Sequence, residues 1–351
     1  MNREFWHKKR VFLTGHTGFK GSWLSLWLAD MGAEVHGFSL EPDTEVNLYT
    51  SIELNKFIGR STLCDIRDLD AITLAMNIAR PEIVIHMAAQ PLVRNSYADP
   101  VKTYEVNVMG TINLLEAIRK TKSVKAVVNI TTDKCYDNCD WVWPYRENDK
   151  LGGYDPYSNS KACSELVTSA YRSSFMDSAG VHIASARAGN VIGGGDWSAD
   201  RIVPDFLRAI NEGRTLTIRS PKAVRPWQHV LEPLSGYLTL AEKLMIEGKE
   251  FAEPWNFGPE DKDAKSVQWL LNYLSKKVAT ATWKLDDTPQ PHEAKTLKLD
   301  STKAKSKLDW EPRWNIEKAL DMTLEWHSAW KKNSDMKNFT LSQIREYETA
   351  N

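Results

Sequence analysis

The stretch Thr14-Gly15-His16-Thr17-Gly18-Phe19-Lys20-Gly21 decides the fold that we predict for this chain. It follows a strand-like run at 10–13 and precedes a segment at 22–32 whose apolar residues recur at helical intervals. A strand, a glycine turn and a helix in this order begin a dinucleotide-binding unit, because the glycines permit a sharp turn and a close approach to a pyrophosphate. The N–H groups at the start of the helix would then bind the phosphates. A turn that needs glycine only for its own conformation can have the same spacing. The position of this turn directly after the first strand favours a dinucleotide-binding unit over such a turn.

Strand-like and helix-like segments alternate through the first half of the chain. The segments that read as strands lie at 10–13, 35–39, 60–64, 82–89, 125–130 and 182–186, and the helical patterns between them lie at 68–79, 99–121 and 156–174. This alternation predicts the α/β class, with a Rossmann-like doubly wound parallel sheet and right-handed crossovers. Ligands in such folds bind beyond the carboxyl ends of the strands, so the residues that follow each strand are the candidate site residues.

The regular alternation ends after Arg187, where shorter elements punctuated by proline and tryptophan begin. We therefore expect an NAD-binding part over 1–187, with a return at about 226–250. A smaller α+β substrate-binding part would take up 188–225 and about 251–351. The chain from 315 to 350 reads as two charged amphipathic helices, which predicts a solvated flank.

Composition excludes several classes of partner. The 351 residues carry 45 basic and 46 acidic side chains, a net charge of -1, which gives no electrostatic footprint for nucleic acid or an anionic membrane. No apolar run reaches about 20 residues and the first ten residues are polar, so we expect a cytoplasmic protein. The four cysteines include a Cys135-x-x-x-Cys139 spacing without a second ligand pair, so we expect reduced thiols and no metal.

Tyr157 and Lys161 form the second informative motif, because residues four apart lie on one face of a helix. An ammonium beside a phenol favours the phenolate and lowers the pKa of the phenol. Such a tyrosine can accept the proton of a sugar hydroxyl while a hydride leaves the same carbon. Chance spacing is the alternative, and the glycine turn in the same half of the chain favours the catalytic interpretation.

Several motifs together resemble the extended short-chain dehydrogenase/reductases over nearly the whole chain. They are the glycine turn, Asp65-Ile66 after the third strand, the segment 86–90 after the fourth, Asn107, and the Tyr157–Lys161 pair. The resemblance implies that NAD is bound by a set of residues from these motifs: Gly15, Thr17, Gly18, Phe19, Lys20, Gly21, Asp65, Ile66, Ala88, Ala89, Gln90, Asn107, Tyr157 and Lys161.

The second strand departs from that family. Ser39 stands where an aspartate often holds the adenosine ribose, and Glu41 follows two residues later. No arginine follows the strand to bind a 2′-phosphate, which favours NAD over NADP.

Within the superfamily, the segment 131–136 resembles the Thr-Asp-Glu segment of nucleotide-sugar 4,6-dehydratases. The segments 145–157, 187–197 and 228–230 resemble in particular the members that act on CDP-glucose. The resemblance implies dehydration of CDP-glucose to a 4-keto-6-deoxy sugar, for the deoxysugars of O-antigen and lipopolysaccharide. It also implies a homodimer or higher homo-oligomer, formed through the helices at 99–121 and 156–174.

The same resemblance assigns roles around the substrate. Thr132 would hold the C4 oxygen, and Asp133, kept protonated by burial, would donate to the leaving C6 hydroxyl. Lys134 stands where relatives carry glutamate. It would be the C5 base if its amine is neutral, and otherwise it would stabilise the enolate. An exposed ion pair in a turn is the alternative for 133–134.

The substrate-binding residues implied by the resemblance are Asn190, Arg201 and Arg225, which match positions that contact the nucleotide diphosphate. Arginine suits bidentate phosphate recognition. His229 and the pair His292-Glu293 are weaker candidates, which would more often satisfy local hydrogen bonds.

Two other functions remain open from the sequence. A nucleotide-sugar 4-epimerase shares the glycine turn and the Tyr157–Lys161 pair, but it needs no acid for elimination, and Asp133 counts against it. A non-catalytic NAD-binding scaffold typically loses the tyrosine or the lysine, and both are present here.

Overall fold

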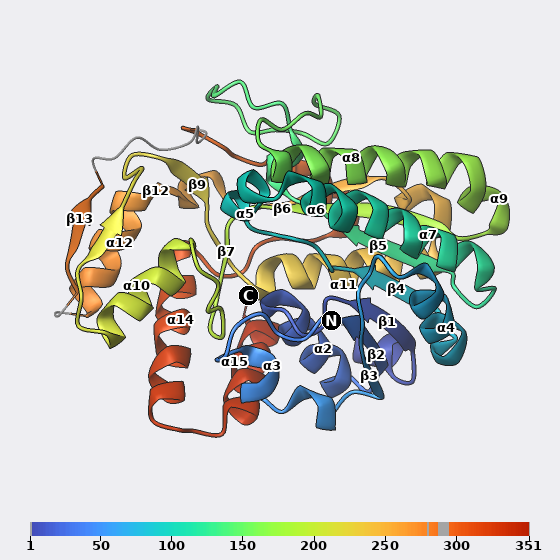
Figure 1. Ribbon diagram of the computed structural model, residues 1–351, viewed down its shortest axis with the longest axis horizontal. Coiled ribbons are helices and arrows are strands. Elements are labelled where there is room, and N and C mark those ends of the chain that lie inside the picture. Colours follow the sequence, from blue (N-terminus) through green and yellow to red (C-terminus); the bar gives the residue numbers. More distant parts are fainter. Residues whose placement is uncertain (1, 279–280, 287–294, 351) are drawn as a thin grey trace.

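A seven-stranded parallel sheet forms the centre of the protein in a computed structural model that describes residues 2–278, 281–286 and 295–350 (Figure 1). The strand order is β11-β6-β5-β4-β1-β2-β3, and every neighbouring pair is parallel. The strands are β1 (Arg10–Thr14), β2 (Glu34–Ser39), β3 (Arg60–Leu63), β4 (Ile83–His86), β5 (Ala126–Ile130), β6 (His182–Ala188) and β11 (Pro254–Phe257). The order reverses between β1 and β4, which creates a crevice at the carboxyl ends of these strands. The predicted doubly wound α/β fold is confirmed.

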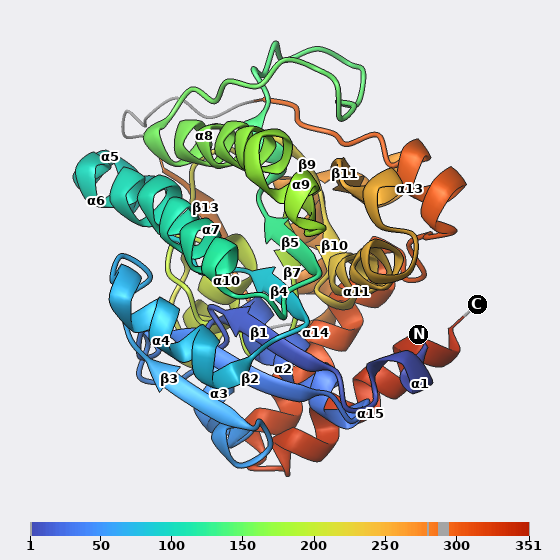
Figure 2. The same ribbon diagram turned by 90° about the vertical axis from the view of Figure 1, so that its right-hand side faces the viewer.

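Helices cover both faces of the sheet (Figure 2). One face packs against α4 (Leu69–Ala79), α7 (Gly110–Lys120) and α8 (Pro156–Tyr171), and the other against α2 (Phe19–Asp30) and α11 (Leu231–Ile246). Side chains alternate between the two cores as the pleat requires: Phe12 and Val127 belong to the first, whereas Leu13 and Val128 belong to the second. Both faces of the sheet are therefore covered by apolar cores.

The predicted helix at 99–121 is divided by a turn of π-helix. Asp99 caps the first part by accepting a hydrogen bond from Lys102 N, with Pro100 at the first helical position. The parts are α6 (Pro100–Tyr104), η2 (Glu105–Met109) and α7, with α5 (Val93–Ala98) before them. A similar π-turn, η4 (Arg172–Met176), separates α8 from α9 (Asp177–Ala179). The first π-turn places Asn107 toward the interior, where it is fully buried.

A smaller group of elements lies beyond the crevice. Its two-stranded sheets pair β7 (Val191–Ile192) with β10 (Gln228–His229), β8 (Leu216–Ile218) with β13 (Trp283–Leu285), and β9 (Val224–Pro226) with β12 (Ala264–Ser266). Helices α10 (Ile202–Asn211) and α12 (Val267–Lys277) pack on them around Phe206 and Leu270. The remaining elements are α1 (Arg3–Trp6), α3 (Leu48–Ser51), η1 (Leu54–Lys56), η3 (Asp133–Cys135), η5 (Gly248–Phe251), η6 (Asp261–Asp263), α13 (Thr302–Leu308), α14 (Ile316–Lys331) and α15 (Met336–Thr349).

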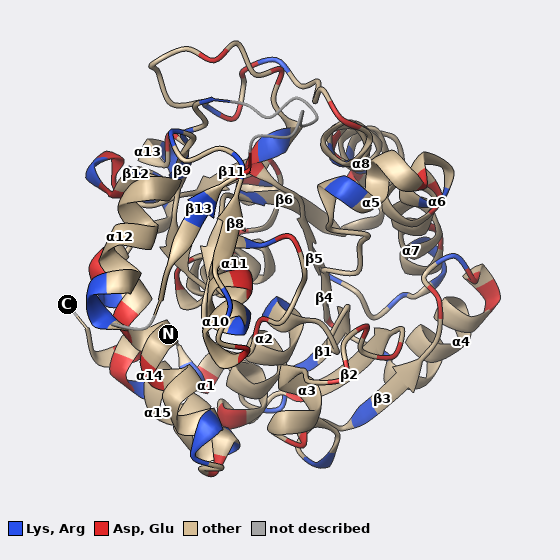
Figure 3. Cartoon of the chain, turned by 60° about the vertical axis from the view of Figure 1, so that its left-hand side comes forward, with Lys and Arg blue, Asp and Glu red and all other residues tan. Residues whose placement is uncertain are grey.

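The C-terminal helices are not the solvated flank that their charges predicted. Trp326 of α14 and Tyr347 of α15 are buried in the main core, and α15 packs against α2, where Trp27 Nε1 donates to Glu348 Oε1 at 2.9 Å. Figure 3 shows both charge signs along α14 and α15.

A second correction concerns residues 254–257. We assigned them to the smaller part, and they form β11 of the main sheet. Within the described residues, no helix combines the length and the apolar character needed to cross a membrane.

Candidate active site

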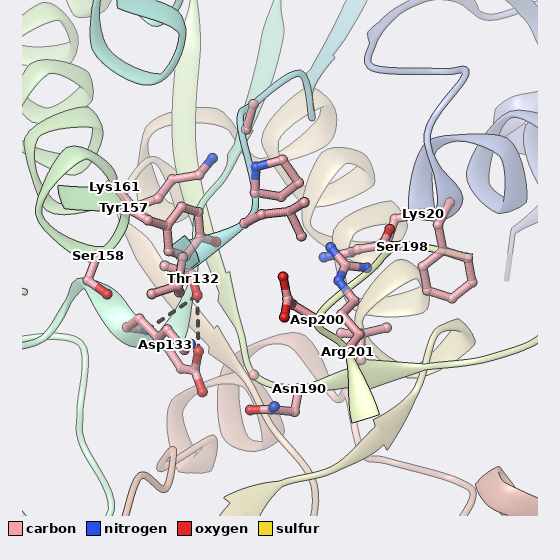
Figure 4. A pocket seen from close by; sticks show the side chains of 18 of the residues that line it. Lys20, Thr132, Asp133, Tyr157, Ser158, Lys161, Asn190, Ser198, Asp200 and Arg201 are labelled. Carbon is pink, nitrogen blue, oxygen red and sulfur yellow. Dashed lines mark hydrogen bonds between the residues drawn. The ribbon is translucent and has the colours of Figure 1, made fainter. Parts of the chain in front are cut away.

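A cavity of about 1130 Å³ opens where the strand order reverses, between the central sheet and the smaller group of elements (Figure 4). Its lining includes the glycine turn after β1, the segments that follow β4, β5 and β6, the start of α8, and the loop before α10. All five predicted catalytic residues and all three predicted substrate-binding residues line it: Thr132, Asp133, Lys134, Tyr157, Lys161, Asn190, Arg201 and Arg225.

The glycine turn forms a cradle that larger residues would fill. Gly15 has a φ of +78°, and a Cβ there would lie 2.8 Å from Ala88 N. A Cβ on Gly21 would lie 2.0 Å from Gly15 O. Gly18 begins α2 without a side-chain cap, so the helix start is open to a phosphate. The residues present therefore fit the pyrophosphate of a dinucleotide.

The end of β2 explains what Ser39 does in place of an acidic residue. Its Oγ shares a hydrogen bond of 2.8 Å with Thr17 Oγ1, and Thr17 donates to Leu40 O. Glu41 and Asp43 follow and line the cavity. The serine ties the glycine turn to β2, and carboxylates remain available two and four residues beyond it. After β3, Asp65 lines the same cavity and is paired with Arg67.

Gln90 and Asn107 do not line the cavity, although we grouped both with the cofactor-binding residues. Asn107 Oδ1 accepts from Gln90 N at 2.8 Å, and its Nδ2 donates to Gln90 O and to Ser160 Oγ. The pair therefore joins the end of β4 to α8. In this geometry both residues position the segment that carries Ala88 and Ala89, which do line the cavity.

Tyr157 and Lys161 lie side by side at the start of α8, close to the end of β5. Lys161 Nζ donates to Ile130 O at 3.1 Å, and burial lowers the pKa of this amine to about 8. Burial raises the pKa of the Tyr157 phenol to about 12, and a hydrogen bond with Thr132 acts in the opposite direction. The expectation that Lys161 lowers this phenol pKa does not hold, because burial dominates in a site without ligands.

Thr132 and Asp133 follow β5 directly, and η3 turns the chain so that both face the cavity. Thr132 Oγ1 donates to Asp133 Oδ1 at 3.0 Å, and Asp133 is 2% exposed. Burial raises the pKa of this carboxyl, although the charge of Lys134 opposes the shift. Oδ2 has no hydrogen-bond partner among the described residues. A buried carboxyl with one unsatisfied oxygen suits a proton donor, and the surface ion pair considered from the sequence is excluded.

A buried ion pair lies beneath these residues and was not foreseen. Glu165, one turn after Lys161, accepts two hydrogen bonds from Arg187, one from Ser185 and one from Thr131. Both side chains of the pair are under 5% exposed. The ion pair therefore fixes the end of β5 against β6 and α8, directly behind the segment 131–133.

Basic side chains also line the cavity. Arg201 pairs with Asp196 at 2.9 Å, and Arg225 is buried against the cavity. Lys20 Nζ donates to Tyr237 Oη at 3.0 Å. Burial, followed by the charges of Lys161 and Arg201, lowers the pKa of the Lys20 amine to about 7. Several further charged residues line the cavity and were missed from the sequence, among them Arg94, Asp200 and Arg219.

His229, one of the weaker candidates, does not line the cavity. His229 is buried between the rings of Trp23 and Trp314, and its Nδ1 accepts from Leu231 N. Residues 292 and 293 lie outside the described residues. In the described part of the chain, no three His, Cys, Asp or Glu side chains come together as a metal site requires.

Known proteins resemble this chain over its whole length. The family described as GDP-mannose 4,6 dehydratase matches residues 12–323. CDP-glucose 4,6-dehydratase of Salmonella typhimurium is 52% identical, over 100% of this chain and 99% of that protein. The structure of Thermus thermophilus UDP-glucose 4-epimerase in complex with NAD has a TM-score of 0.79 at 25% identity, covering 91% of this chain and 99% of that one. Bacillus anthracis dTDP-glucose 4,6-dehydratase in complex with NAD has a TM-score of 0.76 at 20% identity, covering 94% and 99%, which shows the shared fold.

Proposed function

This chain belongs to the GDP-mannose 4,6 dehydratase family, and we propose that its substrate is CDP-glucose. The protein is an NAD-dependent nucleotide-sugar 4,6-dehydratase, and CDP-4-dehydro-6-deoxyglucose would be its product. The observation that carries the choice of substrate is the 52% identity to CDP-glucose 4,6-dehydratase over the full length of both chains.

The residues that would hold NAD are those of the glycine cradle and the strand ends beside it. Gly15, Gly18 and Gly21 leave room for the pyrophosphate, and Glu41 and Asp43 are the acidic residues after β2 that are available to a ribose hydroxyl. When bound, NAD supplies the hydride acceptor for C4 and the hydride donor for C6.

The protein's own residues would carry out the proton transfers. Tyr157 would accept the proton of the C4 hydroxyl as its phenolate, which the adjacent Lys161 ammonium would stabilise once substrate and NAD fill the cavity. Thr132 would hold the C4 oxygen from the other side. With C4 oxidised, the proton on C5 becomes acidic, and elimination of the C6 hydroxyl requires one acid and one base.

Asp133 is the proposed acid. Burial raises the pKa of its carboxyl, which favours the protonated form, and Oδ2 can serve the leaving hydroxyl. Lys134 lines the cavity next to it and is the proposed C5 base. Its Nζ has no hydrogen-bond or ion-pair partner within the described residues, so none of these residues competes with the substrate for it.

The same observations weigh against the other functions. An epimerase needs no proton donor at C6, so the buried Asp133 favours dehydration. A scaffold needs no tyrosine and lysine in its cavity, and Tyr157 and Lys161 are both there.

A homodimer is part of the proposal. Exposed apolar side chains lie along α5 to α8 and η4: Tyr97, Val101, Met109, Leu166 and Phe175. These helices lie side by side on one flank of the protein, which supports pairing with a second copy. We also place the enzyme in the cytoplasm and in the synthesis of O-antigen deoxysugars of lipopolysaccharide, on the strength of the resemblance.

One experiment tests the function. The purified protein is incubated with NAD and, separately, with CDP-, dTDP-, GDP- and UDP-glucose labelled with deuterium at C4. We expect a 4-keto-6-deoxy product from the CDP sugar, with the deuterium at C6 and no net build-up of reduced nicotinamide. Inversion at C4 without loss of water would identify an epimerase, and stoichiometric reduction of NAD would identify a simple dehydrogenase.

A further inference from the structure

A carboxylate occupies the basic wall of the cavity. Oδ1 of Asp200 lies 3.2 Å from Arg94 Nη1 and 3.1 Å from Arg219 Nη2. The two arginines come from different parts of the fold: Arg94 from α5, near the end of β4, and Arg219 from the residue after β8. All three side chains line the cavity.

The backbone turns sharply at this carboxylate. Asp200 has a φ of +60°, in the left-handed region, and Arg201 after it is the N-cap of α10. Figure 4 shows both side chains reaching into the pocket. Arg201 is paired in turn with Asp196. Aspartates therefore already form ion pairs with three arginines of the cavity wall: Arg94, Arg201 and Arg219.

A nucleotide-sugar substrate brings a diphosphate, and Arg94 and Arg219 are two of the cavity arginines available to it, beside Arg201 and Arg225. Guanidinium groups bind phosphate oxygens in pairs, and a carboxylate held in the same place repels the incoming charge. A diphosphate that binds Arg94 and Arg219 would therefore either add to them beside Asp200 or take its position.

We propose that Asp200 is an internal counter-ion, which the diphosphate of the substrate displaces from between Arg94 and Arg219. This inference rests on the proposed function, because it assumes a nucleoside diphosphate ligand.

The geometry favours displacement. One oxygen of Asp200 serves both arginines, and the side chains of Asp200, Arg94 and Arg219 are 33%, 46% and 29% exposed. Exposed pairs of this kind contribute little to stability. The ion pair of Arg187 with Glu165 is the contrast, because it is 2% and 4% exposed and uses both carboxylate oxygens. A ligand cannot replace Glu165 in that buried pair. A phosphate with several oxygens can replace the one Asp200 oxygen that Arg94 and Arg219 share.

The test is Asp200→Asn, in which the side chain keeps its size and tolerates the left-handed backbone but loses its charge. Calorimetry measures the Kd of CDP and of cytidine. We expect the Kd of CDP to fall about three- to tenfold, as expected when two exposed ion pairs no longer compete. The Kd of cytidine should not change, because cytidine has no phosphate.

Asp205→Asn is the matched control. Asp205 lines the same cavity and is paired with Arg208 on its own helix, so the variant removes the same charge without freeing Arg94 or Arg219. A similar gain in both variants would mean a general charge effect and would overturn the proposal. An unchanged or raised Kd in Asp200→Asn would also overturn it, because Asp200 would then hold the arginines in place for the ligand.

Arg219→Ala provides the second measurement. This variant should bind CDP more weakly than the wild type. Adding Asp200→Asn to Arg219→Ala should increase the affinity for CDP by a smaller factor than Asp200→Asn does in the wild-type background. If the wild-type protein binds none of CDP, dTDP, GDP and UDP, the proposed function fails. If the wild-type protein binds CDP but Asp200→Asn does not bind it more tightly, only the inference about Asp200 fails.

Discussion

A side-chain carbon at position 189 would lie 2.8 Å from Asp133 Oδ2, so the proposed acid has its place only because residue 189 is glycine. Gly189 follows β6, the strand beside β5, and the same added carbon would lie 2.5 Å from Pro226 Cγ. The space at the unsatisfied oxygen is therefore shaped by three separate segments of the chain.

Gly189→Ala should move the carboxyl of Asp133 and slow the loss of water. We expect kcat to fall by about 10² or more, the usual contribution of a general acid, with near-normal exchange of the C5 proton with solvent deuterium. Single-turnover kinetics with a mass-spectrometric assay of C5 exchange separates the two steps. If the rate of water loss and the rate of C5 exchange fall equally, the variant disturbs the whole site rather than the acid. Asp133→Asn, which removes the acid itself, shows the ratio of the two rates to expect.

Tyr157→Phe should keep the binding of substrate and NAD but lower kcat by about 10² or more, because the proton of the C4 hydroxyl loses its acceptor. Isothermal titration checks binding and steady-state kinetics checks turnover. A variant that turns over near the wild-type rate would remove Tyr157 from the mechanism.

Lys134→Met should abolish elimination but leave C4 oxidation intact. Reduced nicotinamide and a 4-keto sugar should then accumulate on the enzyme, and solvent deuterium should no longer enter C5. Lys134→Glu is the informative partner, because a carboxylate can also remove the C5 proton, so this variant should retain exchange. Normal exchange in the Met variant would move the base elsewhere and leave Lys134 as an electrostatic neighbour of the enolate.

Glu232 should make stability depend on pH. Its carboxylate on α11 accepts hydrogen bonds from Tyr347 Oη, Arg313 N and Trp314 N, yet burial raises its pKa to about 7. The folded state therefore holds a proton that the unfolded chain releases near pH 4.5. The protonated Glu232 carboxyl contributes fully to the free energy of unfolding below pH 4.5, and this contribution is lost as the pH rises through about 7.

Glu232→Gln removes this titration. Between about pH 4.5 and 8, the stability of the wild type should fall relative to the variant by an amount on the order of 3 kcal/mol. The Tm of both proteins, measured across this range, checks the sign. A Tm difference that stays constant with pH would contradict the assignment.

Local patterns made much of the fold predictable. The predicted strands appear in the sheet within a few residues of their predicted ends. The central strands β4 and β5 were the clearest, because a buried parallel strand needs apolar residues on both faces. The glycine turn was predictable for a similar reason, since a Cβ at Gly15 or Gly21 would overlap the backbone.

Burial and partners could not be predicted in the same way. Helix α15 has the charge pattern of a surface helix, and only the packing shows that its apolar stripe covers α2. The link between Asp200 and Arg94 joins positions far apart in the chain, and neither residue belongs to a motif. The pKa of Tyr157 depends on how far the cavity excludes water, which residue spacing does not reveal.

The packing of α15 on α2 has a consequence for biosynthesis. Trp27 of α2 contacts Tyr347 and Glu348, so part of the first long helix made is covered by the last one. About 320 residues separate these positions, and at about 5–20 residues per second the ribosome needs roughly 16–64 s to add them. The nascent N-terminal half therefore presents an uncovered aromatic surface throughout translation, and chaperones that bind emerging apolar segments have that time in which to act.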